Sequence, residues 1–585
     1  MWLESDEEKT DRFAMLSNLF IIQNDSDQQD AIMVFSRAEA KGALVNFRTG
    51  DLGVLYPTSE NNFRSVLRNQ IFKCTILDLN SEQVIVKLRS SQFNQSLFKN
   101  NRYWNIEQDN LDSSFNSMYK NLFTWAAASS EYRKLILGLT EPRMRHKDAP
   151  IVFEGNCTEN QTSLLNKVLA ARDYFLIWGP PGTGKTSVIL RNIVAHLHQN
   201  TDENIMVLAY TNRAVDEICD AIISIGQDYK NHYLRLGSRV NTNVKYSDNL
   251  LDQIVKSMHS RHEILQLLAG KRIFVSTVSS MVNKIELFRL KVFDTVIIDE
   301  ASQILEPMLA GLLCSFKRFI LIGDHKQLPA VVVQDKYKSS ITDPKLTTIG
   351  ITDTRMSLFE RLYMQLVKNG WNDAFGILDQ QGRMHKTIME FSDRHFYEGK
   401  LKILPGNLRQ TQDKFFEQGP EGFEIFQNRK LFINAPEDED LNWKTNKYEA
   451  AFCLQIIKKI LMLYKVNGKS FHGDSIGIIT PYRAQIALIH KYLEELPKDI
   501  TQKISVDTVE RYQGGARDII IISFCVNRLS QLQSLISLSQ EGVDRKLNVA
   551  LTRAREQLVL IGNRELLSTD HVYKSLFESC TELKM

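Results

Sequence analysis

The fold of this chain is decided by the segment Gly179-Pro180-Pro181-Gly182-Thr183-Gly184-Lys185-Thr186. This segment matches the phosphate-binding loop GxxxxGK(S/T). The apolar run Tyr174–Trp178 precedes it and a helix is predicted to begin near Ser187, which is the order of strand, loop and helix that the motif requires. Glycines let backbone N–H groups close around phosphate oxygens, so we expect the whole loop to bind a nucleotide. Lys185 is expected to reach the β- and γ-phosphates, and the Thr186 hydroxyl to bind Mg²⁺.

Two carboxylates, Asp299 and Glu300, end a second apolar run at Val296–Ile298. Asp299 is placed to hold Mg²⁺ and Glu300 to polarise an attacking water, which is the division of labour that hydrolysis of a nucleoside triphosphate needs. Alone, such a pair is more often a solvated strand end. Because it follows a phosphate loop, it predicts the second half of one hydrolytic site.

Short apolar runs that alternate with helical stretches predict an α/β fold, because parallel strands buried on both faces read as continuous apolar segments. A first series comprises residues 174–178, 205–209, 272–276, 292–298 and 318–322. After a helical stretch around residues 355–400, a second series comprises residues 475–479, 519–524 and 558–561. The sequence therefore predicts two α/β lobes.

The beginning of the chain has a different pattern. Residues 1–105 carry short alternating segments, clearest in the hairpin of Phe72–Leu79 and Gln83–Arg89, and predict a small β-domain. From Leu111 onward a helix is expected, with apolar side chains that we expect to pack into a core: Phe115, Met118, Leu122, Phe123 and Trp125. The predicted units are therefore a small β-domain at 1–105, a helical stalk at 106–150, a first lobe at 151–345 with a helical insertion at about 240–270, and a second lobe at 346–585.

The composition is that of an ordinary globular protein and disfavours several classes. Seventy-two Lys and Arg against sixty-nine Asp and Glu give a formal charge of +3, so any basic track for nucleic acid must be local. The seven cysteines are scattered without a CxxC pair, which argues against zinc or iron–sulfur sites and favours reduced core thiols. The N-terminus is acidic and no apolar run reaches the length of a membrane span, so we expect a cytoplasmic protein with no membrane partner.

The two chemical motifs belong to a longer ordered set that resembles the motifs of superfamily 1 helicases. Residues 299–303 (DEASQ) and 323–329 (GDHKQLP) are similar to motifs II and III. The other similarities are Asn160-Gln161 to the Q motif, residues 209–216 to motif Ia, 381–385 to motif IV, 476–482 and 506–514 to the motifs that follow it, and 547–555 to motif VI. The DEASQ and TRAR forms, with a β-domain before the Q motif, are most similar to the 1B branch. That branch contains the nonsense-mediated-decay RNA helicase and the Okazaki-fragment nuclease-helicase.

The resemblance implies two RecA-like P-loop lobes with an N-terminal small β-barrel-like domain and a helical stalk. It also implies ATP and Mg²⁺ as cofactors, with Gln161 reading adenine and Gln327 sensing the γ-phosphate. Arg383 and Arg553 would reach across from the second lobe to stabilise charge on the transferred phosphoryl group, the alternative for each being a surface salt bridge. Single-stranded nucleic acid is the implied partner, along Thr211, Asn212, Arg213, Ser276, Thr277, Thr480, Pro481, Tyr482 and Thr508.

The function expected from this resemblance is that of an ATP-dependent helicase or translocase that moves 5′ to 3′ and separates strands at duplex junctions. The alternative is an ATP-gated nucleic-acid clamp or remodelling scaffold with little unwinding. A P-loop kinase or GTPase is disfavoured by the DEASQ and TRAR motifs. The choice between DNA and RNA stays open, because these motifs contact the backbone of the strand, and so does any protein partner.

Two positions depart from the family's pattern near the nucleotide base. Gly382 stands where many members have a tyrosine that stacks on adenine, and Ala516 replaces a glutamate near the ribose. We therefore expect weakened nucleotide affinity or base selectivity. The phosphate and metal residues are intact, so an active enzyme is still expected.

Overall fold

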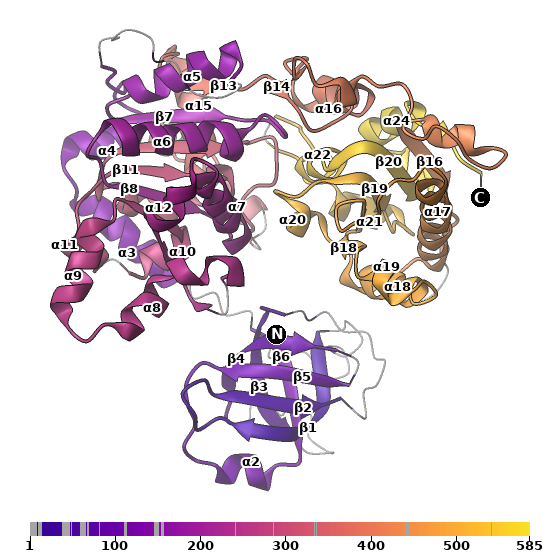
Figure 1. Cartoon of the computed structure of the whole chain (residues 1–585), viewed down its shortest axis with the longest axis horizontal. Coiled ribbons are helices and arrows are strands. Elements are labelled where there is room, and N and C mark those ends of the chain that lie inside the picture. Colours follow the sequence, from indigo (N-terminus) through magenta and orange to yellow (C-terminus); the bar gives the residue numbers. More distant parts are fainter. Residues whose placement is uncertain are drawn as a thin grey trace.

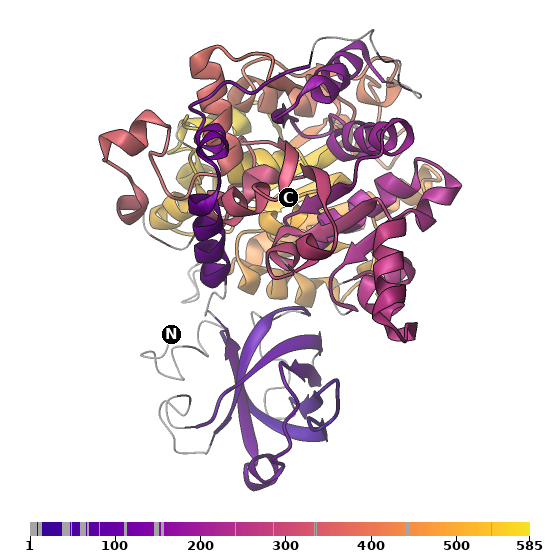
Figure 2. The same cartoon turned by 90° about the vertical axis from the view of Figure 1, so that its left-hand side faces the viewer.

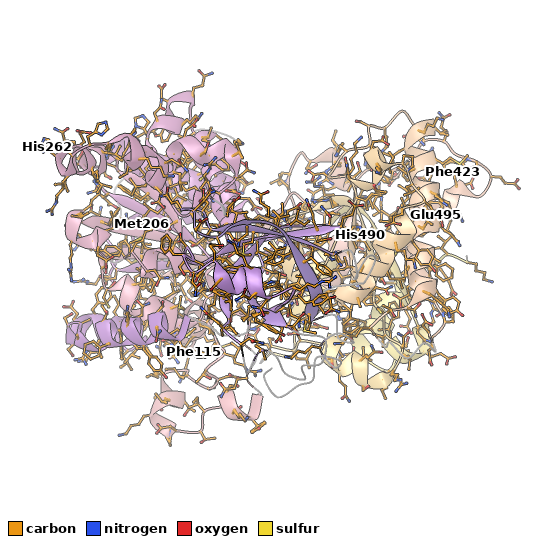
Figure 3. The ribbon with its side chains drawn as sticks, turned by 90° about the horizontal axis from the view of Figure 1, so that it is seen from below. Phe115, Met206, His262, Phe423, His490 and Glu495 are labelled. Carbon is orange, nitrogen blue, oxygen red and sulfur yellow. The ribbon has the colours of Figure 1, made fainter. Side chains whose placement is uncertain are left out.

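The computed structural model consists of a β-barrel and two α/β lobes, with the barrel below the lobes in the first view (Figure 1). Views from the side and from below show the same arrangement (Figure 2, Figure 3). Within the described residues, no helix is both long and apolar enough to cross a membrane. The structure describes residues 9, 14–37, 47, 49–58, 66, 69–80, 82–109, 114–145, 151, 153, 157–239, 242–284, 286–332, 334, 336–438, 444–539 and 541–584.

The N-terminal unit is a closed antiparallel barrel. In barrel order its strands are β1 (Met15–Asp25), β2 (Ile32–Ser36), β5 (Gln83–Leu88), β4 (Phe72–Leu79), β3 (Leu52–Thr58) and β6 (Tyr103–Gln108). Alternate side chains point inward, and Phe35, Trp104 and Ile106 are fully buried in the barrel core. The predicted boundary at residue 105 is too early, because it falls within the last strand of the barrel.

The stalk consists of α3 (Ser114–Ala127) and α4 (Ser130–Ile136). The prediction that its apolar stripe packs into a core holds for Trp125, which packs against a buried hydrophobic cluster, but not for most of the stripe. Phe115, Leu122 and Phe123 are 58%, 38% and 79% exposed, and Tyr119 lies on the same exposed face. The sequence pattern shows that one face is apolar, but it does not show whether another element covers that face.

The buried face of α3 is polar and packs on α12 (Glu306–Leu313) of the first lobe. Asn121 is buried there, and its backbone carbonyl occupies the space that a Cβ at Gly311 would need. The missing side chain at Gly311 thus allows the two helices to approach closely. This contact attaches the stalk to the first lobe.

The first lobe has a parallel sheet, so the carboxyl ends of its strands lie along the same edge. In sheet order its strands are β13 (Phe375–Ile377), β7 (Tyr174–Trp178), β12 (Phe316–Gly323), β11 (Phe293–Ile298), β8 (Ile205–Ala209), β10 (Ile273–Thr277) and β9 (Tyr233–Leu236). One face is covered by α5 (Glu159–Ala170), α6 (Arg191–Asn200) and α7 (Asn212–Ile223), and the other by α12 and α15 (Leu358–Asn369). Parallel strands place their carboxyl ends at one edge, where ligands bind in such sheets.

Two features of this lobe bear on the predicted divisions. Because β13 pairs with β7, residues 346–377 lie with the first lobe, and the predicted boundary after residue 345 is too early. Between β9 and β10 the chain is helical, with α8 (Leu251–Ile254) and α9 (Arg261–Gly270). These helices occupy the region where the helical insertion was expected.

The second lobe has a six-stranded parallel sheet. In sheet order its strands are β18 (Ser505–Asp507), β17 (Ile476–Ile479), β19 (Arg517–Ser523), β20 (Ala554–Gly562), β16 (Lys430–Asn434) and β21 (Thr581–Glu582). One face is covered by α17 (Lys447–Val466) and α18 (Arg483–Leu493), and the other by α22 (Arg545–Leu551) and α24 (His571–Glu578). The two sheets together give the predicted pair of RecA-like lobes.

The barrel also contacts the second lobe. Asp51, which precedes β3, forms ion pairs with Arg483 at 3.2 Å and with Arg511 at 3.7 Å. All three side chains are partly exposed. The barrel is therefore joined to the first lobe through the stalk and to the second lobe through ion pairs.

Candidate nucleotide site and nucleic-acid surface

The phosphate loop follows β7 and leads directly into a helix. Gly182 and Gly184 have φ angles of +76° and +82°, a backbone conformation that side chains with a Cβ rarely adopt. A Cβ at Gly182 would also lie 2.5 Å from the Cβ of Arg383, so glycine is required for the second lobe to approach the loop. The Lys185 Nζ donates a hydrogen bond to the backbone carbonyl of Gly179 at 2.6 Å, which holds the ammonium group over the loop.

Asp299, at the end of β11, lies opposite Thr186. The Thr186 hydroxyl donates to Asp299 Oδ2 at 2.6 Å, and the Glu300 backbone N–H donates to Asp299 Oδ1 at 2.9 Å. Burial and the charge of Glu300 together raise the pKa of Asp299 to about 6. A hydroxyl beside a carboxylate offers the hard oxygen ligands that Mg²⁺ prefers, so these residues fit the predicted metal site.

Glu300 has an unusual backbone conformation for a residue with a side chain, with a φ angle of +52°. Its carboxylate accepts hydrogen bonds from Gln303 Nε2 at 3.1 Å and from Gln513 Nε2, in the second lobe, at 3.3 Å. Such strain persists where the surrounding structure holds it, and it is common at functional sites. Glu300 is thus oriented by groups from both lobes.

A cavity of about 410 Å³ between the lobes brings together every residue predicted to be catalytic. Lys185, Glu300 and Gln327 line it from the first lobe, and Arg383 and Arg553 line it from the second. Arg553 Nη2 donates to Gln327 Oε1 at 3.3 Å, which is a direct contact between the lobes. The sequence motifs predicted that these five residues belong to one site between the lobes, and in the structure all five line one cavity.

The two arginines are held in a partly dehydrated site. Burial lowers the pKa of Arg383 to about 10, and burial together with the charge of Arg383 lowers the pKa of Arg553 to about 9. Both guanidinium groups stay charged at neutral pH. Their repulsion would be relieved by a polyphosphate between them, so the site favours a multiply charged anion.

Sequence reasoning missed Glu217, which lines the same cavity from α7. Its carboxylate lies 3.5 Å from Arg213 Nε, and burial raises its pKa. The signal available in the sequence was the spacing of four residues between Arg213 and Glu217 on a helix. That spacing predicts an ion pair but not its position beside the phosphate loop.

A second cavity, of about 620 Å³, continues from the phosphate loop towards the second lobe. Gln161, Gly382 and Ala516 all line it, so both departures from the family's pattern lie at the same end of the site. The Gln161 side chain is already engaged: Oε1 accepts from the Thr158 backbone N–H at 3.0 Å, and Nε2 donates to the Thr183 carbonyl at 3.2 Å. It therefore joins α5 to the phosphate loop as well as bordering the predicted adenine position.

The residues predicted to bind a strand lie at the carboxyl ends of parallel strands in both lobes, but not all are accessible. Thr211 and Arg213 are exposed, and Asn212, Pro481, Tyr482 and Thr508 are partly exposed. Thr277 is 6% exposed, and its hydroxyl accepts from the Ser280 backbone N–H as a helix cap.

Ser276 and Thr480 are the least accessible residues of the predicted set, because both side chains are fully buried in this structure. The Ser276 hydroxyl donates to the Leu236 carbonyl at 3.1 Å within the sheet. Arg213 also has a partner outside the expected track, since it donates to the Arg511 carbonyl of the second lobe at 3.3 Å. The accessible part of the surface is thus smaller than the predicted set.

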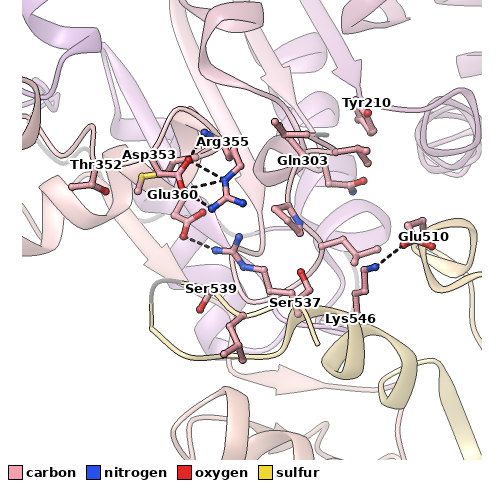
Figure 4. Close-up of a pocket in the computed structure, with 18 of the residues that line it drawn as sticks. Tyr210, Gln303, Thr352, Asp353, Arg355, Glu360, Glu510, Ser537, Ser539 and Lys546 are labelled. Carbon is pink, nitrogen blue, oxygen red and sulfur yellow. Dashed lines mark hydrogen bonds and ion pairs between the residues drawn. The ribbon is translucent and has the colours of Figure 1, made fainter. Parts of the chain in front are cut away.

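A third cavity, of about 470 Å³, lies between the lobes next to Thr211 (Figure 4). Its lining includes Tyr210 from the first lobe and Glu510 and Lys546 from the second. Three ion pairs border it: Lys546 with Glu510 at 3.5 Å, Arg355 with Asp353 at 2.7 Å, and the buried pair of Arg545 with Glu360 at 2.5 Å (Figure 4). Of these pairs, the one between Arg545 and Glu360 joins the two lobes beside the predicted strand path.

Comparison with known proteins finds a matching family model for each lobe. Two family models, each described as an AAA domain, match residues 156–266 with 250–335 and residues 354–565. The chain is 30% identical over 492 residues to the DNA replication ATP-dependent helicase/nuclease DNA2 of Homo sapiens, covering 78% of this chain and 42% of that protein. It thus spans less than half the length of that relative.

Two further similarities cover more of the compared chain. The DNA polymerase alpha-associated DNA helicase A of Saccharomyces cerevisiae is 29% identical, over 73% of this chain and 68% of that protein. The crystal structure of an Arterivirus helicase, nonstructural protein 10, is 11% identical with a TM-score of 0.34, over 91% of this chain and 80% of that chain. The paired AAA domains and the helicase relatives agree with the motif order and with the site between the lobes. The chain therefore belongs to the superfamily 1 helicases, in the branch that includes these DNA replication and polymerase-associated helicases.

Proposed function

We propose that this protein is an ATP-dependent helicase that moves 5′ to 3′ along single-stranded DNA and separates duplexes at junctions. The observation that carries the proposal is the cavity lined by Lys185, Glu300 and Gln327 from one lobe and by Arg383 and Arg553 from the other. A nucleotide there would contact both lobes, so its binding and hydrolysis would change the angle between them. That angle also sets the spacing of the exposed strand-facing residues on the two lobes.

Hydrolysis is assigned to specific groups of the chain. Lys185 and the loop N–H groups would bind the β- and γ-phosphates, and Glu300 would accept the proton of the attacking water. Arg383 and Arg553 would stabilise the charge that develops on the γ-phosphoryl oxygens, for which such arginines contribute roughly 10³- to 10⁵-fold in rate. Thr186 and Asp299 would hold Mg²⁺, which would neutralise part of the phosphate charge.

The strand would lie across both lobes at the carboxyl ends of the sheets. Exposed hydroxyl, amide and backbone groups near Thr211 and Thr508 would bind phosphates without reading base sequence. DNA is the proposed track because the names of the human and yeast relatives refer to DNA. The proposed direction rests on the resemblance to the 1B branch.

One set of assays tests these points together. Hydrolysis of ATP is measured with single-stranded DNA and with single-stranded RNA of the same sequence, and unwinding is measured on duplexes with either a 5′ or a 3′ tail at low salt. We expect stronger stimulation by DNA and unwinding of the 5′-tailed duplex. Unwinding that requires the 3′ tail would contradict the direction, and stronger stimulation by RNA would contradict the track.

The alternative, an ATP-gated clamp or remodelling scaffold, is favoured by the buried ion pair of Arg545 with Glu360, which joins the lobes beside the third cavity. A clamp would show stimulated hydrolysis without displaced strand. The same unwinding assay with both tails therefore separates the two functions.

A further inference from the structure

The Asp324 carboxylate, in motif III, is a buried acceptor of four hydrogen bonds from different parts of the molecule. Oδ1 accepts from Trp178 Nε1 at 2.9 Å and from the Lys326 backbone N–H at 3.1 Å. Oδ2 accepts from Gln327 Nε2 at 2.7 Å and from the Tyr397 hydroxyl at 2.8 Å. Asp324 is completely buried, so each donor strongly influences how the others are arranged.

Tyr397 is the donor that connects Asp324 to the second lobe. It follows α16 (Lys386–Phe396), which packs on α22 and β20 of that lobe. Its hydroxyl donates to Asp324 and accepts from Asn548 Nδ2, on α22, at 2.9 Å. Burial raises the pKa of Tyr397 well above its usual range, and the Asp324 charge raises it further, so the hydroxyl keeps its proton and remains a donor.

These bonds fix the orientation of a side chain in the nucleotide cavity. Gln327 gives its Nε2 to Asp324, which leaves Oε1 to accept from Arg553 Nη2 at 3.3 Å. An amide has one donor end and one acceptor end, so turning it over would set donor against donor at Arg553. The contact between Gln327 and Arg553 thus depends on what Asp324 holds.

The bonds form a circuit that begins and ends on one segment of the second lobe. It runs from Asn548 through Tyr397, Asp324 and Gln327 to Arg553, five residues after its start. All five side chains are buried, with exposures of 2% or less. If the Tyr397 hydroxyl lost its hydrogen bonds, a buried polar group would be left without its partner, which would destabilise the folded protein. The circuit therefore favours a single arrangement.

We propose that Tyr397 is a positioning residue for ATP hydrolysis. Tyr397 orients the Gln327 amide through Asp324. Because Tyr397 also bonds to α22, the orientation of that amide depends on the position of α22 in the second lobe. The proposal rests on the proposed function, because it assigns a role within the same site. A tyrosine that only fills the core would contribute to stability without affecting the step in which Gln327 and Arg553 act.

The first test is Tyr397→Phe, which removes the hydroxyl and keeps the ring. We expect the kcat of strand-stimulated ATP hydrolysis to fall about tenfold, the size expected when one hydrogen bond that supports the transition state is lost. The KM for ATP should change by less than about threefold, because the phosphate loop is untouched. An unchanged kcat would overturn the proposal. Should this variant fail to fold, Asn548→Ala interrupts the same circuit from the other side and is expected to give the same pattern.

A matched control is Tyr573→Phe. Tyr573 is also buried, and its hydroxyl donates to Asp544 Oδ2 at 3.2 Å, where Asp544 caps the start of α22. This variant loses the same chemical group and perturbs the same helix without touching Asp324. We expect its kcat to stay near that of the wild type. A loss equal to that of Tyr397→Phe would place the effect in α22 itself and overturn the proposal.

A double variant then tests the route of the effect. If Tyr397 acts through Gln327, Tyr397→Phe should slow a Gln327→Ala enzyme no further. If the two substitutions instead lowered kcat by the product of their separate effects, the proposal would be overturned. A wild-type protein with no strand-stimulated hydrolysis would refute the proposed function itself, whereas an active wild type with unaffected Tyr397→Phe would refute only the role of Tyr397.

Discussion

Lys185 and Glu300 lie in one cavity but act at different stages of the proposed reaction. Lys185 meets phosphate charge in the ground state, whereas Glu300 matters chiefly in the transition state. Lys185→Ala is therefore expected to abolish ATP binding, and Glu300→Gln to keep binding and lose turnover. Titration with a fluorescent ATP analogue, together with steady-state hydrolysis, measures both quantities.

The control for these variants is Lys284→Ala, because Lys284 is partly exposed and pairs with Asp252 away from the cavity. It should leave binding and turnover unchanged. Equal loss of ATP binding in Lys185→Ala and Glu300→Gln would refute the division of roles between the two residues.

Gly382 borders the cavity where the nucleotide base is expected to lie. A Cβ there would lie 3.1 Å from Leu404 Cδ2, a flexible side chain, and the cavity in front of it is about 620 Å³. Gly382→Tyr is expected to tighten ATP binding by about 0.5 to 1.5 kcal/mol through one stacking contact. Titration of ATP against Gly382→Tyr and Gly382→Ala separates the effect of the ring from that of the added Cβ. Unchanged or weaker binding by the tyrosine variant would mean that another side chain already covers the base.

The site residues divide into those that the sequence reveals and those that it does not. Lys185, Thr186 and Asp299 occur in motifs in which the residue types and their spacing indicate the chemistry, so roles could be predicted for them. Tyr397 could not, because its partners are far away in the sequence and only the packing of the two lobes brings them together. The burial of Ser276 could not be predicted for a related reason, since a motif does not show which way a hydroxyl points.

At the level of single elements, α17 carries a buried charge that makes stability depend on pH. Glu449, in its first turn, is fully buried and accepts from the Ser523 hydroxyl at 2.6 Å and the Cys525 backbone N–H at 2.9 Å. Burial raises its pKa from 4.5 to about 7. A raised folded-state pKa gives stability that is fully present below about pH 4.5 and is lost as the pH rises through about 7.

The expected result is a free energy of unfolding that falls by on the order of 3 kcal/mol from this group between about pH 5 and pH 8. Glu449→Gln should remove the part of this pH dependence that comes from Glu449. The stability of the variant relative to the wild type should therefore increase as the pH rises. Urea unfolding followed in the second lobe at several pH values measures it, with Glu494→Gln, at an exposed position, as the control. Parallel pH profiles for wild type and Glu449→Gln would refute the prediction.

The elements were predictable where a strand is long and buried on both faces. Residues 174–178 and 205–209 were predicted with the bounds that β7 and β8 have. The strands β9, β13, β16, β18 and β21 were missed, because none of them has more than three consecutive apolar residues to stand out. The stalk helix was predicted correctly, but which of its faces is buried was not. The face with the small polar residue Asn121 packs on the first lobe, whereas most of the aromatic stripe is exposed.

For the whole molecule, the position of the barrel predicts its role. It continues into the stalk and touches the second lobe, whereas the nucleotide cavity is lined only by residues of the two lobes. Removing residues 1–109, which takes the whole barrel, should therefore impair unwinding more than strand-stimulated hydrolysis. Both rates are measured on the same preparation, with thermal unfolding to confirm that the lobes remain folded. Equal loss of the two activities would mean that the barrel supports the ATP site instead.

The joint between Asp51 and the second lobe closes a mechanical loop. Three bodies are linked in a circle: the first lobe to the barrel through α3, the barrel to the second lobe through Asp51, and the second lobe back to the first through the chain. In such a linkage no two bodies can turn against each other without moving the third. The ionic joint is the weakest, since each partly exposed pair contributes at most about 1 kcal/mol and is screened by salt. At low ionic strength, rotation of the lobes would therefore move the barrel with them. At high ionic strength, the ion pairs would break and the lobes would rotate without moving the barrel.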